Sequence, residues 1–154
     1  MLQYINFWQI NCHFIPVKSY SHNIFDLYMT LYPLSKLKAL IIDDETDICY
    51  LLGSILKQKN IQSLFAGSLA EAEKTLQSHP DLFFIFLDNH LPDGLGITNI
   101  RQLKKNFPLS HFIMITAHDT NADRKKAKED GADFFIGKPF SKEAIFKTID
   151  ALTS

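Results

Sequence analysis

The chain has 154 residues, of which 46% are apolar, and a formal net charge of −1. This length suits one domain with a sizeable core, and the balanced charge does not favour binding to nucleic acid or to an anionic membrane. Two cysteines, Cys12 and Cys49, are too few for a disulfide scaffold. The longest apolar run, at 82–87, is far shorter than the roughly 18 residues of a membrane-spanning helix. We therefore expect a cytoplasmic protein that contacts neither nucleic acid nor a membrane directly.

The first 35 residues differ in composition from the rest of the chain. They carry two charged side chains, Lys18 and Asp26, but eight of the nineteen aromatic residues. They lack the cationic start and clean apolar stretch of a signal peptide, and they are rich in amino acids with AT-rich codons. We predict that residues 1–35 are an extension, either disordered or the product of a mis-assigned start with Met29 as the true first residue, and that the domain occupies 36–154. A partner-binding arm is the alternative.

Five short apolar runs of strand length follow one another from residue 37 onward. They lie at 39–42, 61–66, 82–87, 112–115 and 134–136. The third run is apolar on both of its faces, which is typical of a central strand in a parallel sheet covered on both sides.

Amphipathic helices are predicted after each of these strands. Apolar residues recur at helical intervals of three and four at Ile48, Leu51, Leu52, Ile55 and Leu56, at Ile97, Ile100, Leu103 and Phe107, and at Ile145, Ile149 and Leu152. Ser68 with Glu71 forms a capping box that opens the second helix, and Ser141 is the expected N-cap of the last.

The fourth predicted helix, at about 120–130, is the weakest of the five. It offers only Ala122 and Ala127 as apolar residues before Gly131 ends it. We therefore expect this helix to be weakly docked on the sheet.

Five strand–helix units predict a doubly wound α/β domain with a five-stranded parallel sheet and helices on both faces, because crossover connections are right-handed and both sheet faces need cover. The flavodoxin-like strand order 2-1-3-4-5 places the switch point between the first and third strands, where ligands bind.

Polar residues collect at the carboxyl ends of the predicted strands. Asp43 and Asp44 follow the first strand, Asp88 follows the third, Thr116 ends the fourth and Lys138 follows the fifth. Clustered carboxylates raise one another's pKa unless a cation neutralises them, and Mg²⁺ prefers such hard oxygen ligands. Each residue alone has an ordinary explanation as a helix cap, a strand end or a loop residue, but the set suits phosphoryl transfer to a carboxylate.

These motifs resemble those of the response-regulator receiver domain. The similarity rests on the acidic pair Asp43-Asp44, the run Leu-Asp-Asn-His-Leu-Pro-Asp-Gly at 87–94, the pair Thr116-Ala117 and the run Gly-Lys-Pro-Phe at 137–140, and it spans about 118 residues. Each motif alone is weak evidence for the family, but the order and spacing of the motifs together are specific to it.

The resemblance implies a role for each matched residue of the acidic site. Asp88 would be the phosphorylated nucleophile. Asp44 and the backbone carbonyl of His90 would ligate Mg²⁺ together with Asp88, and Asp43 would assist through water. Lys138 would bind the phosphoryl group.

The resemblance also implies a switch. Thr116, with its neighbour Ala117, would turn toward the phosphoryl group, and Phe135 matches an aromatic residue that swings inward in the active state; an ordinary core aromatic is the alternative. Pro139 would allow a cis Lys138–Pro139 bond. Histidine stands at positions 90 and 118, two residues after the acceptor and two after Thr116, where the family varies.

The expected function is that of a phosphorylation-dependent switch in a two-component system. The phosphoryl donor would be a sensor histidine kinase or a histidine phosphotransfer protein, and the output an unknown protein target, because no output domain follows in this chain. A Mg²⁺-dependent aspartyl phosphohydrolase is the alternative, but no second carboxylate stands two residues after Asp88. A docking receiver that works without phosphorylation is a further alternative, which the intact acidic set disfavours.

Overall fold

The computed structural model of the chain describes residues 37–117 and 120–154. The predicted extension at 1–35 and the histidine at position 118 therefore lie outside the described residues. Within the described ranges, no helix is long and apolar enough to cross a membrane.

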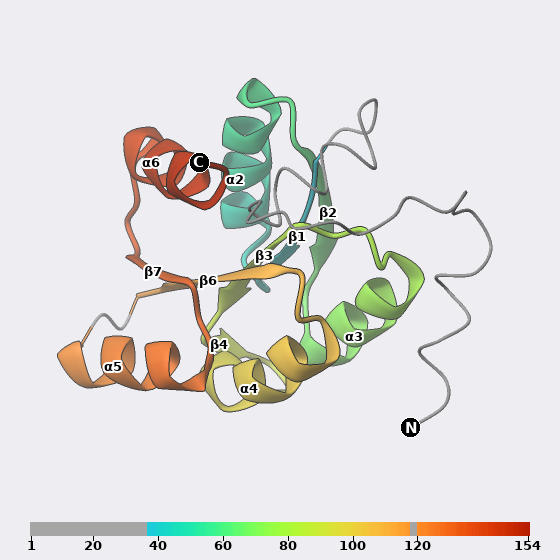
Figure 1. Ribbon diagram of the computed structural model, residues 1–154, viewed down its shortest axis with the longest axis vertical. Helices are drawn as coiled ribbons and strands as arrows, with labels where there is room; N and C mark the ends of the chain where they lie inside the picture. Colours follow the sequence, from blue (N-terminus) through green and yellow to red (C-terminus); the bar gives the residue numbers. More distant parts are fainter. Residues whose placement is uncertain (1–36, 118–119) are drawn as a thin grey trace, which may run out of the picture.

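A parallel sheet of five strands forms the centre of the molecule (Figure 1). Its strands are β1 (Lys38–Ile42), β2 (Gln62–Ala66), β3 (Phe84–Asp88), β6 (His111–Thr116) and β7 (Phe134–Gly137). They lie in the order β2-β1-β3-β6-β7, and every neighbouring pair is parallel. This is the predicted order 2-1-3-4-5, so the fold class and the position of the switch point are confirmed.

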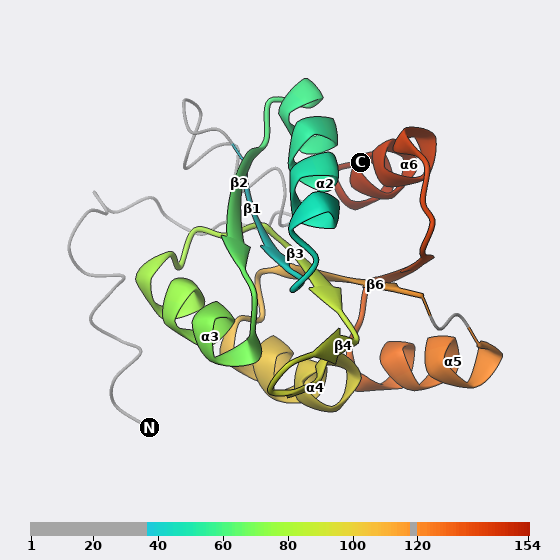
Figure 2. The same cartoon turned by 180° about the vertical axis from the view of Figure 1, so that it is seen from behind.

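In the part of the chain that the structure describes, five helices cover the two faces of the sheet. They are α2 (Thr46–Gln58), α3 (Leu69–Ser78), α4 (Gly96–Asn106), α5 (Asn121–Asp130) and α6 (Lys142–Leu152). Helices α2 and α6 lie on one face, and α3, α4 and α5 lie on the other (Figures 1 and 2). The predicted N-caps hold: the Ser68 hydroxyl accepts from the N–H of Glu71 and the Ser141 hydroxyl accepts from that of Ala144.

The alternation of side chains along the strands produces two separate cores. Ile41, Phe84 and Phe86 point toward α2 and α6, whereas Leu40, Ile85 and Leu87 point toward the helices of the opposite face. All six are fully buried. Strand β3 contributes to both cores, which explains why its sequence is apolar without alternation.

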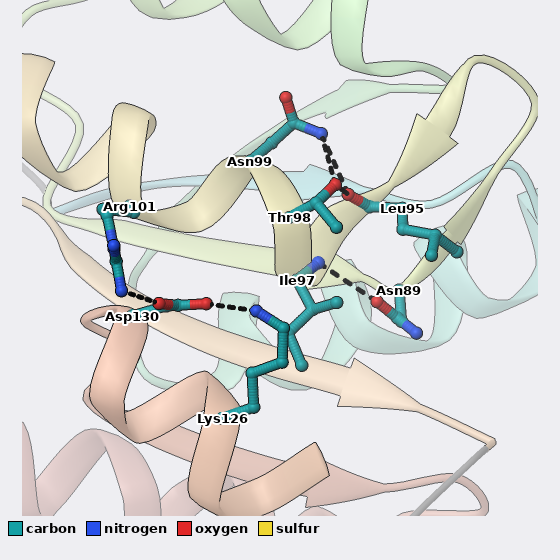
Figure 3. A network of polar contacts seen from close by, with 8 residues as sticks. All are labelled: Asn89, Leu95, Ile97, Thr98, Asn99, Arg101, Lys126 and Asp130. Atoms are coloured by element: carbon teal, nitrogen blue, oxygen red, sulfur yellow. Dashed lines mark hydrogen bonds and ion pairs between the residues drawn. The ribbon is translucent and has the colours of Figure 1, made fainter.

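Helix α5 has little apolar packing against the domain. Ala127 is its one buried apolar residue, and the buried Asp130 accepts from Arg101 of α4 at 2.5 Å and from Lys126 at 2.6 Å (Figure 3). Gly131 ends the helix with φ of 110°, a left-handed conformation that favours glycine. The thin apolar contact agrees with the expectation of weak docking, and the ionic contact to α4 adds a feature that was not predicted.

The segment after β3 forms a small antiparallel hairpin that was not predicted. Its strands are β4 (His90–Leu91) and β5 (Gly94–Leu95). Asp93, in the turn, accepts from the N–H groups of Leu69 and Ala70 at 2.9 Å each, so it caps the start of α3. These two hydrogen bonds lower the pKa of Asp93.

A second charged contact joins α4 to the sheet near Asp133, which precedes β7. Its carboxylate accepts from the Lys104 ammonium and from the N–H of Phe112, both at 2.8 Å, and lies 3.7 Å from the His111 ring. Burial alone would raise the pKa of Asp133, but the groups of His111, Lys104 and Phe112 together lower it to about 2. The ionised form of Asp133 therefore stabilises the fold.

Acid is expected to remove this stabilisation. A carboxyl group with a pKa of about 2 in the folded chain and about 4 in the unfolded chain contributes fully above about pH 4 and loses its contribution as the pH falls toward 2. The full linkage would contribute about 2.7 kcal/mol to the free energy of unfolding, which partial exposure to solvent reduces to about 1 kcal/mol. The Tm of Asp133→Asn should lie several degrees below that of the parent at pH 6, and the difference should shrink below pH 4.

Asp150→Asn is the matched control, because Asp150 forms an exposed ion pair with Lys59. Its Tm should stay within about two degrees of the parent value at each pH, since exposed pairs contribute little. A difference in Tm between Asp133→Asn and the parent that stays constant from pH 6 to pH 3 would contradict this prediction.

Candidate functional site

A pocket opens at the carboxyl ends of β1, β3, β6 and β7. Its volume is about 320 Å³, and it is lined by Asp44, Glu45, Asp88, His90, Ala117 and Lys138. The pocket lies at the switch point of the sheet, where an open parallel sheet places its ligand site. Its polar groups lie at the carboxyl ends of β1, β3 and β7 or within three residues of them, so the order of the sheet brings them together.

Asp88, the last residue of β3, is held from two sides. Its Oδ2 accepts from the N–H of His90 at 2.6 Å, and its Oδ1 lies 3.1 Å from the Lys138 Nζ. The residue is buried, yet it lines the pocket. The carboxylate is therefore fixed in orientation and faces a space that a small ligand can enter.

Asp43 and Asp44 follow β1 and differ in their surroundings. Asp43 is buried; its Oδ1 accepts from the N–H of Glu45 at 2.9 Å and its Oδ2 lies 2.7 Å from the Lys138 Nζ. Burial raises the pKa of Asp43, while the hydrogen bonds of Lys138 and Glu45 act in the opposite direction. Asp44 is exposed and lines the pocket.

Lys138 follows β7 and joins the acidic groups. Its ammonium lies within 3.1 Å of carboxylate oxygens from Asp43, Glu45 and Asp88. Burial alone would lower the pKa of Lys138, but the hydrogen bonds to these carboxylates hold it well above its usual value. Lys138 is thus protonated throughout the physiological range. The bond between Lys138 and Pro139 is cis.

The remaining predicted residues lie on the side of the pocket toward α5. Thr116 is buried at the end of β6, and its carbonyl accepts from the N–H of Lys138 at 2.8 Å. Ala117 is exposed and lines the pocket. Phe135, on β7, is half-buried, and the Arg124 guanidinium of α5 lies 5.0 Å from the centroid of its ring. Phe135 therefore contacts the helix that is held least by apolar packing.

The pocket has the chemistry of a divalent cation site. Carboxylates from Asp43, Glu45 and Asp88 contact the one ammonium, that of Lys138, and the Asp44 carboxylate adds a fourth at the same pocket. Hard oxygen ligands of this kind suit Mg²⁺. Among the described residues, no three acidic, histidine or cysteine side chains already converge as metal ligands. The ammonium bridges the two buried aspartates instead. The donor set fits the ion, and the surplus negative charge favours it.

Residues 39–150 match the model of the response regulator receiver domain. The chain belongs to this family.

Other receiver proteins resemble the chain in sequence and fold. It is 34% identical over 118 residues to the phosphate regulon transcriptional regulatory protein PhoB of Escherichia coli, covering 75% of this chain and 51% of PhoB. The beryllofluoride-activated NtrC4 receiver domain dimer, a solution structure, is 36% identical with a TM-score of 0.71, covering 75% of this chain and 95% of that one.

A response regulator protein from Burkholderia pseudomallei has been crystallised with a phosphorylated aspartic acid, a calcium ion and citrate. It is 27% identical with a TM-score of 0.68, covering 73% of this chain and 65% of that one. The chain spans about half the length, or less, of the curated relatives it matches.

Two residues of this receiver domain were missed by the sequence analysis. Glu45 contacts Lys138, although its residue type and place after the acidic pair gave no sign of it. Gly96 opens α4 directly against β3: a Cβ added there would meet the carbonyl oxygen of Asp88 at 2.2 Å. A glycine two residues after the Asp-Gly turn was the one signal in the sequence for such a close approach.

Proposed function

We propose that this receiver domain is phosphorylated on Asp88 and that the phosphoryl group changes the surface it offers to a partner protein. The observation that carries the proposal is the Asp88 carboxylate, which lies buried at the end of the central strand, is oriented by the His90 N–H and faces a pocket containing the Lys138 ammonium. The crystallised relative from Burkholderia pseudomallei, with its phosphorylated aspartic acid, supports the same chemistry.

In the proposed reaction, an Asp88 oxygen attacks the phosphorus of a phosphohistidine donor. The new O–P bond forms as the P–N bond breaks, and the imidazole nitrogen leaves with the electron pair of that bond. The donor would be a sensor histidine kinase or a histidine phosphotransfer protein of the cytoplasm. Lys138 neutralises a phosphoryl oxygen, and the His90 N–H keeps the carboxylate oriented during the attack.

Asp43, Asp44, Asp88 and the carbonyl of His90 are the groups we propose to hold Mg²⁺. The ion would supply positive charge to the phosphoryl oxygens during transfer. Asp44 and Asp88 face the pocket directly, whereas the buried Asp43 is suited to contact through water.

Incubation with acetyl phosphate and Mg²⁺ tests this function. A hydroxylamine-labile phosphoryl adduct, measured as an increase in intact mass, is expected with Mg²⁺ and not with excess EDTA. An unmodified protein after incubation with Mg²⁺ and several small phosphodonors would overturn the proposal.

The proposed switch connects the pocket to α5 and β7. Thr116 and Lys138 are joined through the Thr116 carbonyl, and Phe135 lies three residues before Lys138 beneath Arg124. Because α5 buries a single apolar side chain, a small energy can shift its position. Thr116 and Ala117 would turn toward the phosphoryl group, and Phe135 would move inward.

Amide hydrogen exchange measures this shift. With Mg²⁺ and beryllofluoride, a phosphoryl mimic, exchange in residues 120–137 is expected to change, while exchange in β1 and α2 stays close to that of the free protein. Unchanged exchange in α5 and β7, with beryllofluoride shown to be bound, would contradict the proposed switch.

A further inference from the structure

The Lys138 ammonium has no proton left for a phosphoryl group. An ammonium has three N–H donors, and three carboxylate oxygens surround it: Asp43 Oδ2 at 2.7 Å, Glu45 Oε1 at 2.8 Å and Asp88 Oδ1 at 3.1 Å. A phosphoryl oxygen that binds Lys138 must therefore displace one of these three acceptors.

The three carboxylates differ in how readily they can leave. The side chains of Asp43 and Asp88 are 4% and 6% exposed, and each accepts a second hydrogen bond from a backbone N–H. A buried carboxylate that lost Lys138 would remain poorly solvated, which costs free energy, unless a bound cation took the place of the ammonium. Glu45 is 62% exposed at the start of α2, so water can hydrate its carboxylate when Lys138 moves away.

The Glu45 side chain also lines the pocket that a phosphoryl group would enter, together with Asp88 and Lys138. A carboxylate at this position repels an entering anion, and it occupies the proton of Lys138 that the anion needs. Both effects weaken the binding of a phosphoryl group.

We propose that Glu45 is a positioning residue that holds Lys138 in the unphosphorylated domain and competes with the phosphoryl group for it. The inference rests on the proposed function, since it assumes that Lys138 binds a phosphoryl group at Asp88. Glu45 thereby lowers the affinity of the resting site for phosphoryl anions, and its release from Lys138 accompanies phosphorylation.

The test is beryllofluoride binding at saturating Mg²⁺, measured by calorimetry on the full chain. Glu45→Gln keeps the length of the side chain but removes its charge, so we expect about threefold to tenfold tighter binding of beryllofluoride, and Glu45→Ala should act in the same direction. Asp47→Asn is the matched control, because Asp47 is an exposed acidic residue in the first turn of the same helix. Its affinity should stay within about twofold of the parent value.

A second measurement distinguishes the loss of the contact with Lys138 from a general effect of removing a negative charge on beryllofluoride affinity. In a Lys138→Ala background, Glu45→Gln should change beryllofluoride affinity no more than Asp47→Asn does. Unchanged or weaker binding in Glu45→Gln, an equal gain in Asp47→Asn, or a gain that persists without Lys138 would overturn the inference. Absence of Mg²⁺-dependent beryllofluoride binding in the parent protein would instead count against the proposed function.

Discussion

Asp88→Asn is expected to abolish phosphorylation of the protein by acetyl phosphate. An amide at this position keeps the size of the side chain and can still accept from the His90 N–H, but it lacks the nucleophilic carboxylate oxygen that faces Lys138. Intact mass after incubation with acetyl phosphate and Mg²⁺ should show the phosphoryl adduct in the parent and none in Asp88→Asn.

Asp93→Asn is the control for this result. Asp93 lies five residues further along the chain, in the turn between β4 and β5, where its carboxylate caps α3. Its loss should lower stability slightly and leave the labelling intact. Undiminished labelling of Asp88→Asn would place the nucleophile elsewhere in the pocket.

Gly96→Ala is expected to damage both the fold and the site. A Cβ at residue 96 would lie 2.2 Å from the Asp88 carbonyl oxygen and 3.0 Å from the Leu87 side chain. Backbone cannot give way as a flexible side chain does, so β3 and the start of α4 must separate. We expect a loss of about 3 kcal/mol in the free energy of unfolding, seen as a fall in Tm of about 10 °C, together with slower labelling of Asp88.

Gly67→Ala provides the comparison for this variant. The nearest atom to a Cβ there is a Glu71 carboxylate oxygen at 3.6 Å, an ordinary van der Waals distance. Its Tm should remain within a few degrees of the parent value. A Gly96→Ala protein as stable as Gly67→Ala would show that the approach of α4 to β3 is looser than described.

The strands and their carboxyl ends could be predicted because each apolar run is followed within two residues by a polar residue, and the order 2-1-3-4-5 was that of the flavodoxin-like fold. Apolar runs such as 82–87 give the strands, and the polar residues after them, Asp88 above all, identify the ends that meet at the switch point. Right-handed crossovers leave few ways to arrange five such units. The helices followed from apolar spacing and from caps such as Ser68 and Ser141.

The contact between Glu45 and Lys138 could not be predicted in the same way. The two residues are separated by 93 positions, and whether an exposed glutamate turns toward the pocket depends on its rotamer rather than on any periodicity. The pairing of Asp130 with Arg101 is similar, because it depends on how closely α4 and α5 approach each other. The β4–β5 hairpin is too short to show an alternating pattern.

The proposed place of phosphorylation is tested most directly by chemical mapping of the acceptor. The protein is labelled with acetyl phosphate and Mg²⁺, treated with borohydride to reduce the acyl phosphate to homoserine, digested, and examined by peptide fragmentation. The account predicts homoserine at residue 88 and at no other aspartate of the pocket. Homoserine at Asp43 or Asp44, or a phosphoryl group on His90 with Asp88 unmodified, would contradict it.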